Sequence, residues 1–149
     1  MGTHHRGTDD EVRALDAYIK LLRAAESVAS RLSPQWTDAG LTVSQFGALE
    51  ALWHLGPMCQ ADLGKKLLKS GGNITMVVVN LERRGLVRRT RDNPADRRIV
   101  NVYLTDEGRA LIAGLWPGHV AAIHADLAAL TPDEQAELAR LCRKLGRRT

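Results

Sequence analysis

The sequence has few cysteines and few aromatic residues, and it contains no long apolar run. Its 149 residues include two cysteines, too few for a disulfide framework, and the N-terminal residues lack the apolar segment of a signal peptide. No stretch approaches the roughly 20 apolar residues of a membrane span. Aromatic residues make up 4% of the chain, which argues against a protein that stacks single-stranded bases. We therefore expect a cytoplasmic protein with no membrane contact.

The remaining composition is that of a globular protein with unevenly distributed charge. Hydrophobic residues make up 44% and charged residues 26% of the chain, which suits one folded domain. Residues 1–62 carry five Lys or Arg against eight Asp or Glu, whereas residues 63–149 carry sixteen against nine. An anionic partner is therefore expected to contact the second part of the chain.

The basic charge is most concentrated in residues 83–98. This segment holds seven arginines and two aspartates, an excess of +5 in a chain whose net charge is +4. It runs from the end of an amphipathic segment through two β-like stretches, which are separated by the turn residues Asn93 and Pro94. A basic hairpin directly after a helix is an electrostatic footprint for a phosphate backbone. The segment predicts double-stranded DNA as a partner.

Start and stop signals predict a mainly α fold with a small β-wing. Thr8 with Glu11 and Thr42 with Gln45 form capping boxes, and Gly56-Pro57 is a stop signal. Pro117-Gly118 is expected to kink or break the helix that contains it. Helices are predicted at 9–33, 43–55, 60–67, 73–84 (capped by Ser70), 106–130 (capped by Thr105) and 132–145, and strands at 86–92 and 99–104. Two short helices joined by a turn and followed by a hairpin are typical of a winged helix-turn-helix.

The two ends of the chain carry apolar stripes that a small domain cannot bury alone. One stripe covers residues 12–32, and the other runs from Leu138 to Leu145. Such stripes predict a homodimer in which the partner covers them. We expect a single domain over residues 1–149, with dimerisation helices in 8–40 and 106–149 and a DNA-binding winged helix-turn-helix lobe in 41–105.

Several segments resemble the MarR-type transcription regulators, and the similarity covers nearly the whole chain. The matching segments are Leu41–Phe46, Gln60–Gly64, Ile74–Thr75, Leu81–Val87, Asp96–Arg98 and Leu104–Gly108. The resemblance implies a homodimer that binds a pseudo-palindromic operator, most often as a repressor. It also implies release from DNA by a small phenolic or other aromatic effector, although some members instead sense oxidants through cysteine.

The helix over residues 73–84 is predicted to contact bases. Asparagine can pair with adenine, and methionine can meet a thymine methyl group. The alternative is an ordinary solvated face, but such a face seldom carries outward Met and Val with so few charges. The predicted DNA contacts here are Ser70, Gly72, Asn73, Thr75, Met76, Asn80 and Arg83.

The hairpin is predicted to contact the DNA backbone and minor groove through Arg91, Asp96, Arg97 and Arg98. By resemblance, Arg98 would enter the minor groove, Asp96 would hold it by an ion pair, and Arg97 would meet phosphate. A narrow minor groove concentrates negative potential and favours an inserted arginine. A surface hairpin without a DNA role is the alternative, as in a winged-helix module that binds only proteins.

The signal that controls DNA binding is expected to be a small molecule. Trp36, Trp53, His54 and Trp116 are candidates for the lining of an aromatic-effector pocket, although each of them could serve a purely structural role. The alternative is redox sensing by Cys59, which stands where members of the family often have a capping Ser or Thr; Cys142 is expected in the core. No metal or cofactor is expected, and motifs such as GxxxxGK[ST], HExxH and GxSxG are absent from the sequence, which argues against an enzyme.

Overall fold

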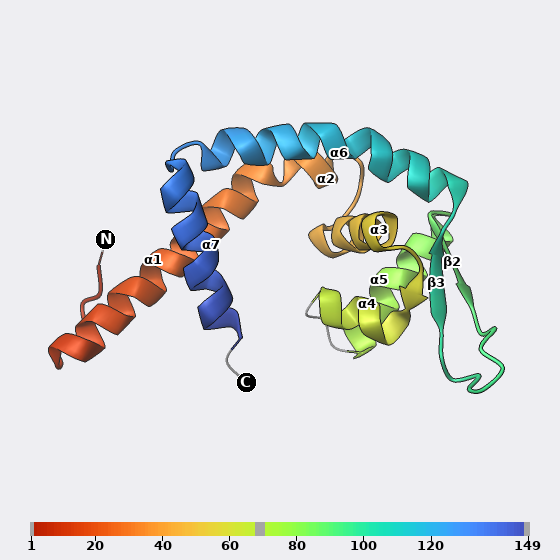
Figure 1. Cartoon of the computed structure of the whole chain (residues 1–149), viewed down its shortest axis with the longest axis horizontal. Helices are drawn as coiled ribbons and strands as arrows, with labels where there is room; N and C mark the ends of the chain where they lie inside the picture. Colours follow the sequence, from red (N-terminus) through yellow and green to blue (C-terminus); the bar gives the residue numbers. More distant parts are fainter. Residues whose placement is uncertain (1, 68–70, 148–149) are drawn as a thin grey trace. The chain divides into compact units, whose positions relative to one another are not determined.

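The computed structural model describes residues 2–67 and 71–147 (Figure 1). The chain forms two compact units. The first contains the chain up to Ser33 and from Val120 onward, and the second runs from Pro34 to His119. Residues 34–40 and 106–119, which the sequence assigned to dimerisation helices, therefore group with the winged lobe. The dimerisation role of the chain ends stays a prediction.

The second unit holds the winged helix-turn-helix. Its elements are α2 (Pro34–Thr37), α3 (Val43–Leu55), β1 (Met58–Cys59), α4 (Gln60–Lys66), α5 (Gly71–Arg83), β2 (Val87–Thr90), β3 (Asn101–Leu104) and the first part of α6 (Asp106–Leu127). The mainly α fold with a small β-wing is confirmed. Its core is formed by side chains from all the longer elements, among them Leu49, Leu63, Val78, Leu81, Val102 and Ile112, each fully buried.

Side-chain caps start the helices where the sequence predicts them. The Thr42 hydroxyl accepts a hydrogen bond from Gln45 N, and the Gln45 side chain accepts one from Thr42 N, at the start of α3. Thr105 Oγ1 accepts a bond from Gly108 N at the start of α6 and donates one to Gly85 O. Thr105 thus joins the end of α5 to the start of α6. The predicted cap Ser70 lies outside the described residues.

The sheet contains one strand that the sequence did not predict. β1 pairs with β3, and β3 pairs with β2, so the antiparallel sheet has the order β1-β3-β2. Met58 is opposite Val102, and Val87 is opposite Leu104. A two-residue strand has no periodicity to detect, so only its pairing reveals it. The two strands of the hairpin are also shorter than predicted, because residues 91–100 form a loop held largely by side chains.

Of the kink or break expected at Pro117, the break does not occur. The helix α6 continues through Pro117 from Asp106 to Leu127. Proline removes one backbone donor, but tertiary packing outweighs that loss here. Ile112 is fully buried, and Leu115 and Trp116 pack against the core just before the proline.

The first unit contains α1 (Asp9–Leu32), the end of α6 and α7 (Pro132–Gly146). Arg31 Nε donates to Asp126 Oδ1 over 2.6 Å and thereby joins α1 to α6. The capping box at Thr8 begins α1 as predicted, and a capping box at Thr131 begins α7 at the predicted residue 132. Cys142 is exposed on α7, which corrects the expectation that it lies in the core. Among the described residues, no helix is both long enough and apolar enough to cross a membrane.

Candidate nucleic-acid interface

The helix α5 buries one face and presents the other to solvent. Ile74, Val78 and Leu81 are buried in the core of the unit. Gly72, Asn73 and Arg83 are exposed, and the Met76 side chain is 60% exposed. Because the opposite face of α5 is fixed in the core, the exposed methionine is suited to contact an apolar group of a partner, such as a thymine methyl group.

Three of the predicted base-contacting residues share one hollow with the start of α3. The hollow has a volume of about 280 Å³ and is lined by Thr42, Ser44, Gln45, Asn73, Met76, Val77 and Asn80. The structure thus brings Asn73, Met76 and Asn80 together. It also adds Ser44, in the first turn of α3, which sequence reasoning missed. The signal was available, because the capping box at Thr42 places Ser44 in the first turn of a helix.

Thr75 has a structural bond in addition to its predicted contact with DNA. Gln60 Nε2, at the start of α4, donates a hydrogen bond of 2.8 Å to Thr75 Oγ1. This bond links the two helices of the helix-turn-helix. Sequence reasoning did not identify Gln60, because it is separated from Thr75 by 15 positions.

The loop of the wing is ordered by its own side chains. Asn93 Oδ1 accepts bonds from Ala95 N and Asp96 N. Arg91 Nη1 donates to Arg97 O over 3.1 Å, so Arg91 braces the loop as well as adding charge. Arg97 is exposed and forms no ion pair among the described residues. The loop therefore presents Arg97 from a fixed backbone.

Asp96 orients Arg98 by the ion pair that the resemblance implies. Arg98 Nε and Nη2 donate to the two Asp96 carboxylate oxygens, each over 3.0 Å, and Arg98 N donates to Oδ1 over 2.9 Å. The Arg98 side chain is 91% exposed, and the Asp96 side chain is 33% exposed. The Arg98 guanidinium, and then its backbone N–H, hold the pKa of Asp96 below its ordinary value. Arg98 thus projects from the wing in a preset direction.

Two further contacts of wing arginines were not predicted. Arg89 of β2 donates to the Glu82 carboxylate in α5 from its backbone N and from its guanidinium. The Arg88 guanidinium lies 4.4 Å from the centre of the Tyr103 ring, a cation–π contact. The first contact fixes the wing to α5, and the second stiffens the β2–β3 hairpin.

Comparison with known proteins agrees with this geometry. The sequence model of the MarR family matches residues 41–100. The HTH-type transcriptional regulator YkoM of Bacillus subtilis is 35% identical over 93% of this chain and 90% of its own. The HTH-type transcriptional repressor NicR of Pseudomonas putida is 33% identical over 84% of this chain and 78% of its own.

A solved structure of a related regulator shows the same fold. It is that of BpsR from Bordetella bronchiseptica, reported in connection with the regulation of its DNA binding by 6-hydroxynicotinic acid. The two chains are 29% identical with a TM-score of 0.79, over 87% of this chain and 91% of that one.

The chain belongs to the MarR family. Residues 41–100, which the family model matches, include α3, α4, α5, β2 and the loop of the wing. This MarR protein is therefore a member of a family of DNA-binding transcription regulators, and the relatives named above are regulators rather than enzymes.

The aromatic residues predicted as an effector pocket form one cluster in this MarR lobe. Trp53, His54 and Trp116 contact one another, with the His54 and Trp116 ring centres 4.6 Å apart. His119 joins this group to Trp36 and Phe46, at ring distances of 5.4 Å to Trp116, 6.3 Å to Trp36 and 4.7 Å to Phe46. Sequence reasoning did not group His119 and Phe46 with these residues.

His119 is polar and incompletely satisfied within this cluster. Its Nδ1 atom is buried and has no hydrogen-bond partner among the described residues. Burial lowers the pKa of His119, and the negative charge of Glu50 opposes this effect. Glu50 also pairs with His54, with Oε1 3.0 Å from His54 Nδ1. The cluster therefore combines aromatic surface with an unused polar atom.

Cys59 does not act as a helix cap. It occupies the N-cap position of α4, but its side chain makes no capping hydrogen bond. The half-buried residue lines a hollow of about 480 Å³ together with Gln60, Asp96 and Arg98. A capping role for Cys59 is thus contradicted, whereas its partial burial leaves a packing role open.

Proposed function

We propose that this MarR protein binds a specific double-stranded DNA sequence, with α5 in the major groove and the wing in the minor groove. The observation that carries the proposal is the ion pair in which Asp96 holds the highly exposed Arg98 side chain. The exposed Asn73 and Met76 would read base edges, and Arg83, Arg91 and Arg97 would contact the backbone. Gly72 and Thr75, which also lie on α5, remain proposed DNA contacts.

The test is selection of duplexes from random DNA by the purified protein, followed by binding measurements at several salt concentrations. Phosphate contacts release counterions, so affinity should fall linearly with salt on a double-logarithmic plot. A protein that enriches no sequence and shows no salt dependence would instead be the protein-binding winged-helix module that the sequence left open.

We further propose a homodimer formed by α1 and α7, which would bind a pseudo-palindromic operator in the cytoplasm. Tyr18 is 57% and Leu22 50% exposed on α1, and Leu141 is 47% and Leu145 56% exposed on α7. Exposed apolar stripes of this kind are typical of oligomer interfaces. Light scattering should give twice the mass of the chain. The variant Leu141→Asp should shift it toward monomer and weaken operator binding, whereas Lys144→Gln should not.

We propose that the protein is a repressor released by a small aromatic or phenolic effector at the aromatic cluster. The naming of NicR as a repressor and the effect of 6-hydroxynicotinic acid on BpsR support this class of mechanism. Because the rings already contact one another, an effector would separate them or stack on the outer ones, and the buried His119 Nδ1 could accept its hydroxyl hydrogen. Titration with hydroxylated aromatic acids should change tryptophan fluorescence and release DNA, and Trp116→Leu should abolish both responses.

Redox sensing by Cys59 is the second candidate, because its thiol lines the same hollow as Arg98. An oxidised or alkylated thiol there could displace the wing loop. A protein carrying both Cys59→Ser and Cys142→Ser distinguishes the two mechanisms. We expect it to keep its response to the aromatic effector, and loss of that response with DNA binding intact would favour the thiol.

A further inference from the structure

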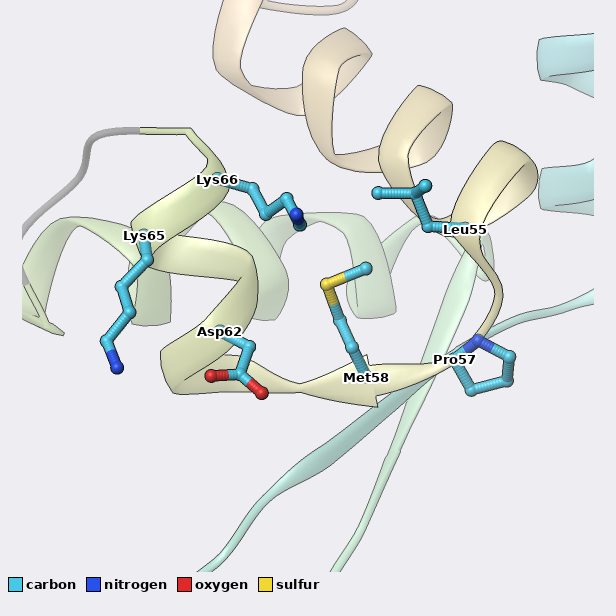
Figure 2. Close-up of a pocket in the computed structure, with 6 residues that line it drawn as sticks. All are labelled: Leu55, Pro57, Met58, Asp62, Lys65 and Lys66. Atoms are coloured by element: carbon cyan, nitrogen blue, oxygen red, sulfur yellow. The ribbon is translucent and has the colours of Figure 1, made fainter. Parts of the chain in front are cut away.

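A separate hollow lies on the winged lobe between the end of α3, β1 and α4. It has a volume of about 530 Å³ and is lined by Leu55, Pro57, Met58, Asp62, Lys65 and Lys66 (Figure 2). Its size falls in the range of small-molecule sites, which is roughly 300–1,000 Å³. None of these residues belongs to the proposed DNA surface or to the aromatic cluster, so the function proposed above does not account for the hollow.

The apolar part of the hollow, here called its floor, is formed by Leu55, Pro57 and Met58. Leu55 ends α3 and is 60% exposed, and Gly56, which follows it with φ 85°, ends the helix. Met58 follows in β1 and packs partly against the core, while Pro57 lies between them. None of the described residues that line this hollow is aromatic. An unbranched methionine beside leucine and proline fits a flexible alkyl chain, because methionine adapts to irregular apolar shapes.

The rim of the hollow carries one more positive than negative charge. Lys65, Lys66 and Asp62 are the charged residues among those described that line it. Neither lysine forms an ion pair with a described residue. Figure 2 shows the Lys66 amine directed toward the apolar floor, between Leu55 and Met58. The Lys65 and Asp62 side chains point to the other side of Met58. A negative group beside Lys66 would thus lie across the floor from Asp62.

From this arrangement we infer that the hollow binds an aliphatic monocarboxylate, with its carboxylate at Lys66 and its alkyl chain on Leu55, Pro57 and Met58. The carboxylate gains an ammonium partner, and the chain covers apolar surface that is otherwise open to water. The site lies within one protomer. It therefore needs neither the proposed dimer nor the proposed effector at the aromatic cluster.

The test uses octanoate as the probe and the methionine methyl groups of the full chain as reporters. The chain has three methionines, Met1, Met58 and Met76. With ¹³C-methyl methionine, octanoate should shift the Met58 signal in a saturable manner and leave the Met76 signal of α5 unchanged. Met58→Leu and Met76→Leu assign the signals. An unchanged Met58 signal, or an equal shift of Met76, would overturn the proposal.

Variants and neutral analogues test the chemistry. Lys66→Gln should weaken octanoate binding about fivefold, which is the upper range for one exposed charge pair. Leu55→Ser should weaken it about tenfold, as expected for loss of a partly covered leucine, and the exposure of Leu55 makes this change compatible with folding. Lys144→Gln, on α7, is the matched control and should bind normally.

Octanol and octylamine complete the test. Octanol lacks the negative charge of octanoate. Its affinity for the unaltered protein should therefore be lower than that of octanoate by the same factor by which Lys66→Gln lowers octanoate affinity. Tighter binding of octylamine than of octanoate would show that Asp62 dominates the rim and would overturn the inference. Since these measurements use no DNA, they do not depend on the proposed function: a failed operator selection would leave the octanoate result unaffected.

Discussion

Glu82 of α5 and Arg89 of β2 are joined by three hydrogen bonds, one from the Arg89 backbone N over 2.9 Å and two from its guanidinium over 3.1 and 3.2 Å. The contact connects the helix proposed to read bases with the wing proposed to enter the minor groove. A change in the angle between them would place the two surfaces out of register with successive grooves. We therefore expect this pair to affect DNA binding even though neither residue need touch DNA.

The first prediction concerns Glu82→Gln, which removes the charge of this contact. The Arg89 guanidinium, and then the Arg89 backbone N–H, hold the pKa of Glu82 below its ordinary value of 4.5. A carboxyl whose pKa is lowered in the fold stabilises the protein above its unfolded pKa, and loses that effect as pH falls through the folded pKa. The variant should thus be less stable at pH 7, by under about 1 kcal/mol for so exposed a pair, and equal to the original protein near pH 2.

Urea unfolding at the two pH values measures this difference, and fluorescence anisotropy with operator DNA measures binding. Glu137→Gln breaks a similar exposed pair with Arg140 on α7 and is the matched control. It should change stability to a similar extent and leave DNA binding unchanged. Equal operator affinity in the two variants would show that the Glu82–Arg89 contact does not orient the wing.

The second prediction separates the charge of Arg98 from its orientation. Arg98→Ala should weaken operator binding by about 1–3 kcal/mol, because it removes the side chain proposed for the minor groove. Asp96→Ala should cost less, since the cation remains but loses its three bonds to Asp96. Arg13→Ala, in an exposed pair on α1, is the control for a general loss of charge. Unchanged affinity of Arg98→Ala would refute the wing assignment.

The third prediction contrasts base contacts with phosphate contacts on α5. Asn73→Ala and Met76→Ala should broaden the set of duplexes that selection recovers, because both side chains are proposed to meet base edges. Arg83→Ala should weaken binding to all duplexes about equally and reduce the salt slope by about 1. If Arg83→Ala altered base preference and Asn73→Ala did not, the two roles would have to be exchanged.

The fourth prediction concerns the close approach of α6 to the end of α5. A Cβ atom at Gly108 would lie 2.0 Å from Leu86 O, which is backbone and cannot move aside like a side chain. Gly108→Ala should therefore destabilise the fold by about 1–3 kcal/mol, the usual cost of overpacking. Gly114→Ala in the same helix would meet no atom within 4 Å. The stability of Gly114→Ala should stay equal to that of the original protein or rise by about 0.5–1 kcal/mol. Thermal unfolding of both variants measures the two effects.

The fifth prediction concerns the acid sensitivity of the aromatic cluster. Burial holds the pKa of His119 below its ordinary value of 6.5, so the unfolded chain binds a proton at a higher pH than the folded one. The stability that the neutral ring contributes is complete above about pH 6.5 and falls as pH drops toward the folded pKa. His119→Phe keeps a ring and removes the titration. Its urea midpoint should fall less between pH 7.5 and pH 5.5 than that of the original protein or of His124→Phe.

The helices could be predicted because their signals are local. The capping boxes at Thr8, Thr42 and Thr131 act over three residues, and the buried face of α5 repeats with helical period. Pro117 shows where this reasoning fails. The local rule allows a break there, but α6 stays continuous where Leu115 and Trp116 pack against the core.

The charged residues of the proposed DNA-binding site could be predicted from the sequence, but the hydrogen bonds between distant residues could not. The basic segment and the resemblance identified Arg98 and Asp96 from sequence. The bonds from Gln60 to Thr75 and from Arg84 to the carbonyl oxygens of Ala39 and Gly40 span 15 to 45 positions. Such pairs depend on how the helices pack, and no spacing rule reveals them. His119 was omitted from the aromatic cluster for the same reason.

The two edge strands of the sheet differ in length and charge. One edge is β1, which is only two residues long, and the other is β2, where Arg88 and Arg89 are exposed. Short edge strands and charged side chains both discourage the edge-to-edge pairing that leads to aggregation. Lobes of neighbouring molecules crowded on the same DNA would therefore not join through their wings into a continuous sheet. Arg88 and Arg89, which stiffen the hairpin and fix it to α5, would also keep the wing from pairing with other copies of itself.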